Sequence, residues 1–362
     1  MIHFNDDLFH VVCSIFAKHD VAPQYADTEP MSEQMWAELT EGGFTSIGPD
    51  AGIADHAALA KAVGACAVAA PVVENGLARW VADSSDVALC GNPRDVVICG
   101  GLNAADRIQA NWSATGDQSE IGVRGTLRRV PWGRYADVLL VPVAGIDALH
   151  WVAVDRGDFK VTEGVNLASE PRDDITFSIT VPATASKLAP SVVEVRARGA
   201  LLRAAAGLGA MEFVLDSALE YSQQREQFGV PLISFQAVDH HLVQIAEAVA
   251  AVSAITDAAV NSEPEYRLMR VAAAKFVFGS QAAILAASAH QIFGAIGTTD
   301  EHVMHRRTRR LWSWEDEYGT RDDWAEILGR QLTFAGSPGA WPVLTPPLSE
   351  LRLRNVGQEV AW

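Results

Sequence analysis

Three long stretches after residue 188 carry apolar residues at three- and four-residue steps, which constrains the fold more than any other feature of the sequence. Such spacing places the apolar residues on one face of a helix. Short connections join the stretches, so we expect the helices to pack together as a bundle. The three predicted stripes are Leu201, Ala205, Leu208, Met211, Leu215 and Ala218; then Leu242, Ile245, Val249 and Val252; then Met269, Ala273, Phe276 and Ile284.

Before the bundle, the sequence pattern changes once, from helical spacing to strand-like runs. Residues 1–87 contain short stretches with helical spacing, such as SEQMWAELTE. Residues 88–187 hold short runs rich in Val, Ile, Phe and Thr between Gly, Asp and Pro, which predicts a compact β-barrel or sandwich. The sequence therefore predicts a multi-domain α+β protein that ends in a four-helix bundle over 188–334. An irregular tail is expected over 335–362, where four prolines occur.

Charge and hydropathy limit the possible partners. The chain has 362 residues and a formal net charge of -17, which disfavours nucleic acid and anionic membranes. The basic run HRRTRR at 305–310 is predicted to be a solvated helix or loop end. Polar residues interrupt the longest apolar stretch, 242–260, so no membrane span is expected.

The cysteines and the first residues predict a cytoplasmic protein. Cys13, Cys66, Cys90 and Cys99 form no CxxC pair, and no His lies at metal-ligand spacing from them. We therefore expect reduced, buried or incidental thiols and no metal site. The segment MIHFNDDLFH lacks a basic region followed by an apolar core, so no signal peptide is expected.

The stretch EYSQQREQFGVPLISFQAVDHH at 220–241 separates the first two bundle helices. Glycine often ends a helix and proline often begins one. Gly229 is therefore predicted to end the first helix, and Pro231 to begin the second.

This stretch and the order of the domains resemble the acyl-CoA dehydrogenase family. The family signature Arg-x-x-Phe-Gly followed by Gln is represented by Arg225, Phe228, Gly229 and Gln236. The resemblance implies that Arg225 and Gln236 reach across a subunit interface to the pyrophosphate and adenosine of a neighbour's FAD. A guanidinium suits this task because its planar donors match phosphate oxygens.

A second segment, HQIFGAIGTTDE at 290–301, is similar to the family's Gln-x-x-Gly-Gly-x-Gly segment. Gln291, Gly294 and Gly297 are present, and Ala295 replaces the second Gly. The resemblance implies cofactor contacts here, since glycine lets backbone approach a ligand closely. An ordinary helix C-cap would explain one of these glycines.

The surface that seats a subunit's own flavin departs from the family pattern. Residues 98–109, ICGGLNAADRIQ, lack both the Thr-Glu-Pro and the Gly-Ser-Asp of the family loop. In the segment 125–143, Arg129 takes the position of the family Trp and Pro131 that of the Ser or Thr. A charged Arg fits poorly against an isoalloxazine, and Pro has no N–H to donate.

The position of the catalytic base departs as well. Desaturation of a CoA thioester needs a carboxylate over the substrate α-carbon. The family register places Tyr318 where the usual Glu stands, and Gly199 at the known alternative position. Glu315 and Glu317 remain as weak candidates in the loop WSWEDEYGTRDDW, which otherwise reads as a structural or interface loop.

The pattern of losses predicts a division of labour. Contacts to a neighbour's FAD are kept, whereas contacts to the chain's own FAD and the base are changed. The chain thus resembles the non-catalytic partner subunits of actinobacterial α2β2 acyl-CoA dehydrogenases. The resemblance implies a catalytic partner chain and a CoA thioester substrate, with a steroid-derived acyl group. Two alternatives stay open: a self-sufficient homo-oligomeric dehydrogenase that uses Glu315 or Glu317, and a flavin-free scaffold or CoA-thioester binding protein.

Overall fold

The structure is a computed structural model that describes residues 5–19, 31–45, 52–89, 92, 94–115, 118–144, 149–182, 190–299 and 301–334. Within these ranges the side chains of residues 112–115, 118, 119, 182, 265, 332 and 334 are left out of the description. The predicted irregular tail, 335–362, lies outside the described residues. The predicted domain bounds, 1–87, 88–187 and 188–334, stay predictions.

The first part of the chain is helical. Its helices are α1 (Asp6–Lys18), α2 (Glu33–Glu41), α3 (Ile53–Cys66) and α4 (Val72–Ser84). The side chain of Asn5 accepts a hydrogen bond from the N–H of Leu8, and Ser32 accepts one from Met35, so both helices begin at an N-cap. Helix α3 is alanine-rich and buried along most of its length, which lets it lie between its neighbours.

The middle part forms two sheets rather than a closed barrel within the described residues. Strands β1 (Val97–Cys99), β4 (Val138–Ala144) and β5 (Leu149–Asp155) form one sheet in the order β1-β4-β5. The other has the order β2-β3-β7-β6, with β2 (Arg107–Thr115), β3 (Gln118–Pro131), β6 (Phe159–Thr162) and β7 (Arg172–Pro182). Side chains of both sheets share one core, so the arrangement is a sandwich.

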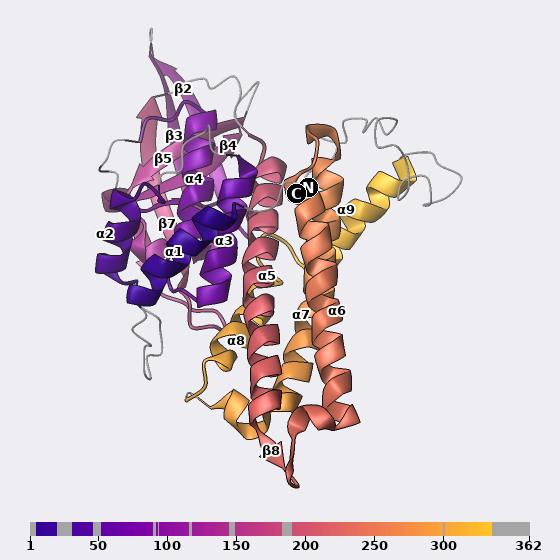
Figure 1. The fold of residues 1–362 in the computed structure, drawn as a ribbon. Helices are drawn as coiled ribbons and strands as arrows, with labels where there is room; N and C mark the ends of the chain where they lie inside the picture. The colour runs from indigo at the N-terminus through magenta and orange to yellow at the C-terminus, as the bar shows by residue number, and fades with distance from the viewer. Residues whose placement is uncertain are drawn as a thin grey trace.

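The smaller sheet is covered on both faces. Leu139 and Val141 of β4 belong to the core shared with the larger sheet, whereas Val138 and Leu140 pack against α4 and the start of α5. Double burial explains why β4 reads as the continuous apolar run VLLVPV instead of an alternating pattern. Helix α4, the small sheet and the large sheet therefore form three layers (Figure 1).

The last part is the helical bundle. Its helices are α5 (Val192–Gln224), α6 (Gln236–Val260), α7 (Pro264–Phe293), α8 (Met304–Trp314) and α9 (Arg321–Phe334). A capping box formed by Ser191 and Glu194 begins α5. In Figure 1, α5, α6 and α7 lie side by side, and α5 separates the other two from the N-terminal helices.

Two of the three predicted stripes are buried, and the third is wrong. Most predicted residues of α5 and α6 lie in the core. On α7, Ala273 and Phe276 are only half-buried and Ile284 is 46% exposed, whereas Phe278 and Leu285 are fully buried. The reason is that α7 is apolar around most of its circumference, so periodicity does not select the face that packs against α5 and α6.

By length and composition alone, the helical segments Gln236–Val260 and Tyr266–Thr298 could cross a membrane. Buried core helices of soluble bundles pass the same test, and these two pack against each other and against α5. The expectations of no membrane span and a cytoplasmic location stay predictions.

Helices α3 and α5 cross at two glycines. A Cβ on Gly64 would lie 1.7 Å from the carbonyl oxygen of Ala206, and one on Gly209 would lie 2.0 Å from that of Lys61. The backbones of the two helices therefore touch, and no side chain fits between them.

Replacing Gly64 by Ala should force α3 and α5 apart and lower the free energy of unfolding by about 2 kcal/mol or more. Chemical denaturation of the purified chain measures the change. Gly329 on the exposed face of α9 is the matched control, because nothing lies within 4 Å of its added Cβ. Gly329→Ala should be neutral or stabilise by about 0.5–1 kcal/mol, and an equal loss in both variants would contradict the proposed contact.

Candidate cofactor and catalytic sites

The junction between α5 and α6 is a β-hairpin. Helix α5 ends at Gln224, and Arg225 caps it by donating its N–H to the carbonyl of Tyr221 at 2.9 Å. Strands β8 (Glu226–Gln227) and β9 (Val230–Pro231) then pair around a two-residue turn. Phe228 and Gly229 have φ values of +55° and +82°, as the turns of tight hairpins require.

The sequence prediction for this junction is therefore wrong in detail. Gly229 lies in the hairpin turn and does not end α5, and Pro231 lies in β9 and does not begin α6. Glycine and proline are favoured in a tight hairpin as well as at helix ends. The sequence signals used here therefore do not distinguish a hairpin from a simple break between two helices.

The side chains of the first family motif are exposed. Phe228 is 93% exposed at the hairpin tip, and Arg225 and Gln236 are exposed as well. Within the described ranges, neither Arg225 nor Gln236 makes a side-chain hydrogen bond or ion pair. A guanidinium and an amide that are free in this way can bind an anionic, hydrogen-bonding group such as a pyrophosphate.

The second family motif ends α7 beside this hairpin. Gly294 has a φ of +62° and caps α7, with its N–H donated to the carbonyl of His290. Phe293 stacks on Tyr221 of α5 at 4.6 Å between ring centroids. The structure thus brings Arg225, Gln291 and Gly294 to one end of the bundle, the lower end in Figure 1.

The two glycines of this motif differ in their surroundings. Gly294 is exposed, and a Cβ there would meet nothing within 4 Å. Gly297 is buried, and its Cβ would lie 2.5 Å from Met304 Cε and 2.8 Å from Phe293 Cβ. Packing of the loop against the start of α8 is therefore enough to require glycine at 297.

The strand expected to seat the chain's own flavin is distorted. A β-bulge interrupts the pairing of β3 with β7 between Leu127 and Val130. Arg129 lies in this bulge with a φ of +53°, its side chain is exposed, and its N–H donates to Asp174 at 3.0 Å. Pro131, the last residue of β3, has no N–H. These residues do not fit the apolar, hydrogen-bonding seat that an isoalloxazine needs.

The two positions at which the family resemblance predicts a catalytic base are in contact. A Cβ on Gly199 of α5 would lie 2.5 Å from Cδ1 of Tyr318, so the tyrosine ring lies directly on this glycine. The ring packs against both hydrophobic cores, and burial raises the pKa of its hydroxyl. Tyr318 has a φ of +58°, and the indole N–H of Trp324 donates to its carbonyl at 3.1 Å. An aromatic ring thus fills the space at both predicted positions.

Glu317 is held by two arginines. Arg172 donates to its Oε1 through Nε at 2.8 Å, and Arg203 donates to Oε2 through Nε at 2.6 Å. Burial alone would raise the pKa of Glu317, but the two guanidinium groups outweigh burial and hold it below its usual value. A carboxylate with a lowered pKa and both oxygens paired is a weak base.

Glu317 belongs to a buried ion-pair network of three glutamates and three arginines. Arg203 also binds Glu74, and Arg172 donates to Glu170 at 2.9 Å. Arg310 donates to the other oxygen of Glu170 at 3.1 Å. Burial opposes ionisation of Glu170, yet its arginine neighbours prevail and lower its pKa to about 2. The buried ion-pair network consists of Glu74 on α4, Glu170 just before β7, Arg172 at its first residue, Arg203 on α5, Arg310 on α8 and Glu317 after α8.

Glu315 differs from Glu317. Its Oε2 is buried and makes no hydrogen bond in the described part of the chain, and burial together with Asp316 raises its pKa. The buried Lys275 donates to the carbonyls of Trp314 and Glu315 at 2.6 and 2.8 Å and so fixes the backbone, not the carboxylate. Of the two candidate bases, only Glu315 has an unpaired carboxylate oxygen.

The basic run on α8 is not a solvated helix end, so that prediction is wrong. Arg307 and Arg310 are buried. Arg307 donates to the carbonyl of Ala65 at the end of α3 at 2.8 Å, and Arg309 donates to that of Leu167 at 2.6 Å. The run therefore attaches α8 to α3 and to the loop before β7. The expectation that the chain does not bind nucleic acid stays a prediction.

The tryptophans of the segment 312–324 differ in burial and in their contacts. Trp314 is fully buried, and its indole N–H donates to Glu170 at 3.0 Å. Trp312 is half-buried and stacks on His290 with 5.8 Å between ring centroids. Within the described ranges, no group of three or more His, Cys, Asp or Glu side chains could hold a metal ion.

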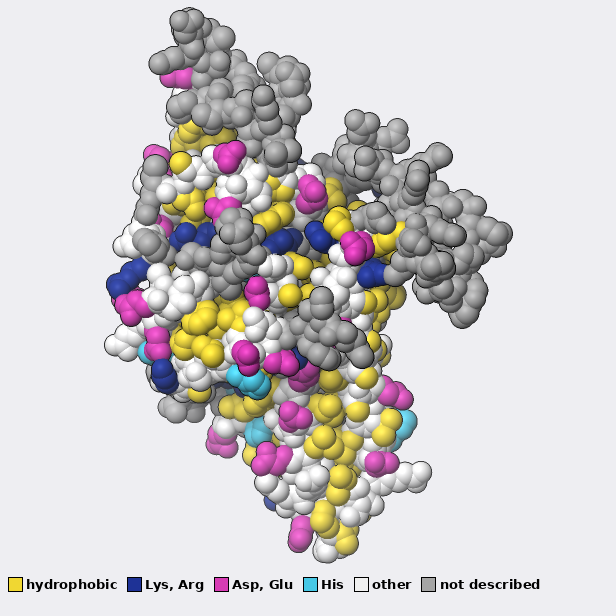
Figure 2. Space-filling view, turned by 45° about the horizontal axis from the view of Figure 1, so that its top comes forward, with side chains coloured by type: hydrophobic (Ala, Val, Ile, Leu, Met, Phe, Trp, Pro, Cys, Tyr) yellow, Lys and Arg dark blue, Asp and Glu magenta, His cyan; other side chains and the backbone are white. Residues whose placement is uncertain are grey.

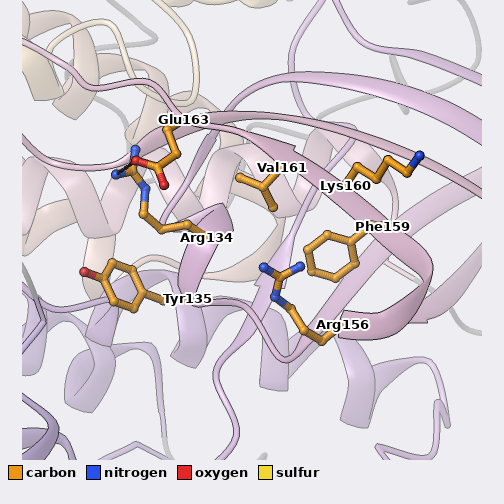
Figure 3. Close-up of a pocket in the computed structure, with 7 residues that line it drawn as sticks. All are labelled: Arg134, Tyr135, Arg156, Phe159, Lys160, Val161 and Glu163. Carbon is orange, nitrogen blue, oxygen red and sulfur yellow. Dashed lines mark hydrogen bonds and ion pairs between the residues drawn. The ribbon is translucent and has the colours of Figure 1, made fainter.

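A hollow of about 680 Å³ lies elsewhere, along strand β6 (Figure 3). The guanidinium of Arg134 in this hollow forms ion pairs with Asp173 at 2.7 Å and with Glu163 at 2.8 Å. None of the residues that line it belongs to either family motif or to the buried ion-pair network. The lining residues are Arg134, Tyr135, Arg156, Phe159, Lys160, Val161 and Glu163.

Comparison with known proteins identifies the bundle. Residues 192–332 match the family model described as acyl-CoA dehydrogenase, C-terminal domain. The bundle is therefore similar to the C-terminal domain of acyl-CoA dehydrogenases. The resemblance inferred from the segments at 220–241 and 290–301 is thereby confirmed.

A curated relative covers part of the chain. Acyl-CoA dehydrogenase FadE34 of Mycobacterium tuberculosis is 30% identical over 190 residues. The match takes in 51% of this chain and 26% of FadE34, so the chain spans about a quarter of the length of that relative.

Solved structures extend the likeness to the whole fold. A chain of the ChsE4-ChsE5 complex from Mycobacterium tuberculosis has a TM-score of 0.77 and 21% identity, covering 94% of this chain and 99% of that one. A chain of the Tcur3481-Tcur3483 steroid ACAD has a TM-score of 0.78 and 20% identity, covering 91% and 98%. The chain therefore has the acyl-CoA dehydrogenase fold from its N-terminal helices to the bundle.

Replacing Glu317 by Gln should lower the free energy of unfolding by about 3–5 kcal/mol, because Arg172 and Arg203 are left buried without their shared anion. The lowered pKa of Glu317 means that its contribution is present above the unfolded value of 4.5 and is lost as the pH falls below it. Stability of the natural chain should thus fall more steeply in acid than that of E317Q.

Denaturation at several pH values measures both effects. The matched control is Glu326→Gln, which removes an exposed pair with Arg330 and should change stability by about 0.5 kcal/mol or less. Equal stabilities of E317Q and E326Q would contradict the structural role assigned to Glu317.

Proposed function

We propose that this chain is the non-catalytic partner subunit of an FAD-dependent acyl-CoA dehydrogenase. The contact between Tyr318 and Gly199 carries the proposal. It fills the place where a base would face the substrate α-carbon, and neither position offers a carboxylate. The catalytic base and the seat of the isoalloxazine then belong to another chain of the same fold.

The exposed end of the bundle supports the other half of the proposal. Arg225, Gln236, Gln291 and the backbone at Gly294 are accessible there and suit the phosphates and adenosine of FAD on the partner chain. When bound, FAD supplies the acceptor for the hydride that leaves the substrate. The residues of this chain bind and orient the far end of the cofactor and take no proton.

Exposed apolar side chains support a protein partner. Besides Phe228, Val230 and Ile296 are each 40% exposed in the hairpin and in the loop after α7. Figure 2 shows apolar side chains running down the lower part of the molecule among scattered acidic groups. Aromatic and aliphatic groups of this kind are typical of protein interfaces.

The substrate class follows from the relatives. Acyl-CoA dehydrogenases named among them support a CoA thioester, and the steroid ACAD with the same fold supports a bulky, steroid-derived acyl group. We propose α,β-desaturation of such a thioester by the assembled heteromer.

The homo-oligomeric alternative now depends on Glu315. The arginines that bind Glu317 leave it unsuited to accept a proton, whereas Glu315 keeps an unpaired oxygen and a raised pKa. Replacing Glu315 by Gln therefore separates the two functions without disturbing the buried ion-pair network.

The complex of this chain with a catalytic acyl-CoA dehydrogenase chain that keeps the Thr-Glu-Pro-x-x-Gly-Ser-Asp loop should retain its kcat when Glu315 is replaced by Gln. Steady-state kinetics of the coexpressed complex measure this. A loss of kcat of about a thousandfold or more, as removal of a catalytic base causes, would favour the self-sufficient enzyme instead.

Replacing Arg225 by Ala should weaken flavin binding by the complex about 10- to 100-fold, the cost of a lost charge-assisted contact of about 1.5–3 kcal/mol. Flavin released during dilution and gel filtration measures the effect. Arg330→Ala removes an equally charged, exposed side chain far along the sequence and should leave flavin occupancy unchanged. Full flavin retention in R225A would count against the proposed contact.

A further inference from the structure

Helices α1 and α3 run side by side in the same direction. At their first turns, Asn5 Nδ2 donates to Asp55 Oδ1 at 3.0 Å. Four residues further along α1 and six further along α3, the ammonium of Lys61 lies 5.4 Å from the ring centroid of Phe9. Cys13 lies eight residues after Asn5, and Cys66 lies eleven residues after Asp55. These steps are about two and about three helical turns, so both cysteines lie further along the facing sides of α1 and α3.

Residues 13 and 66 are both cysteines. The Cys66 thiol is the hydrogen-bonding neighbour of the Cys13 thiol, and neither cysteine is in a disulfide. Each cysteine is partly exposed and packs against the edge of the core. Cys99, in contrast, is buried in the small sheet, and Cys90 lies outside the described residues. Two accessible thiols from sequence-distant helices thus touch, which is the arrangement that a disulfide requires.

We propose that Cys13 and Cys66 are a dithiol modification site, at which a peroxide forms a reversible disulfide that ties α1 to α3. One thiolate attacks the peroxide O–O bond, which breaks and leaves a sulfenic acid and water. The second sulfur then displaces the sulfenic oxygen as water and forms the S–S bond. Two thiols lose two electrons and two protons, and hydrogen peroxide is reduced to two waters.

The surroundings of the pair disfavour ionisation of Cys13. The hydrogen bond to Cys66 and burial raise the pKa of the Cys13 thiol, and Lys61 opposes the shift only in part. Cys13 therefore favours the neutral thiol at neutral pH. Disulfide formation should accelerate with rising pH, because only a thiolate attacks.

A disulfide at Cys66 would also affect the contact between α3 and α8. Cys66 is the last residue of α3, and the carbonyls on either side of it, those of Ala65 and Ala67, accept hydrogen bonds from Arg307 and Arg306 of α8. A covalent tie to α1 would therefore brace the same helix end that anchors α8 and its arginines.

The test uses the full chain with all four cysteines. Hydrogen peroxide treatment at neutral pH, alkylation of remaining thiols, digestion and mass spectrometry should give a Cys13–Cys66 peptide pair lighter by two hydrogens, which dithiothreitol abolishes. Cys13→Ser and Cys66→Ser should each remove the pair, and the matched Cys99→Ser should keep it. One pH unit higher, the pair should form about tenfold faster.

A second readout shows whether the bond forms in the folded protein. Oxidised wild type should melt a few degrees higher than its reduced form, since the disulfide restricts the unfolded chain. C13S should show no such rise. Thiols that stay reduced, sulfinic or sulfonic acid without the linked pair, or a predominant link to Cys90 or Cys99 would each overturn the proposal.

Discussion

The buried ion-pair network is the interaction on which the rest of the structure depends. Its six members come from five stretches of the chain and join α4, α5, the start of β7, α8 and the loop after α8. Burying six charges costs desolvation that only near-complete pairing offsets, so such a network specifies one arrangement more than it adds stability. Every glutamate in it contacts at least one arginine, which fixes the three parts of the chain relative to one another.

This arrangement has a direct consequence for function. Glu317 is fixed by Arg172 and Arg203, and the next residue, Tyr318, is thereby directed onto Gly199. The loop in which the family resemblance predicts a catalytic base is here part of the core. The exposed end of the bundle is not held by such ion pairs within the described residues. Its arginine and amide side chains are therefore available to bind a ligand. Packing thus fills the space beside Gly199, whereas the end of the bundle at the α5–α6 hairpin is exposed.

The sequence predicted the order of the parts and the two family motifs because these depend on local patterns. Periodicity located α5 and α6, and the motif register identified Tyr318 and Gly199 as positions without a carboxylate. It did not select the buried face of α7, since that helix is apolar on most sides, and it did not distinguish the hairpin at Phe228 from a simple helix break.

The buried ion-pair network could not be predicted at all. Glu74 and Arg203 are far apart in the sequence, and a charged residue taken alone is usually solvated. The same rule led to the wrong expectation for the basic run, because its acceptors, the carbonyls at the end of α3 and before β7, are visible only in the folded chain. The contact between Cys13 and Cys66 depends in the same way on how two helices pack.

The measurement that tests the central claim most directly is the flavin content of the chain purified alone, counted from its visible absorbance against its native mass. A partner subunit that seats no flavin of its own should be colourless and inactive without a catalytic chain. One tightly bound flavin per chain in an active homo-oligomer would contradict the account, since it would require a seat that Arg129 and Pro131 do not provide and a base that Tyr318 has replaced.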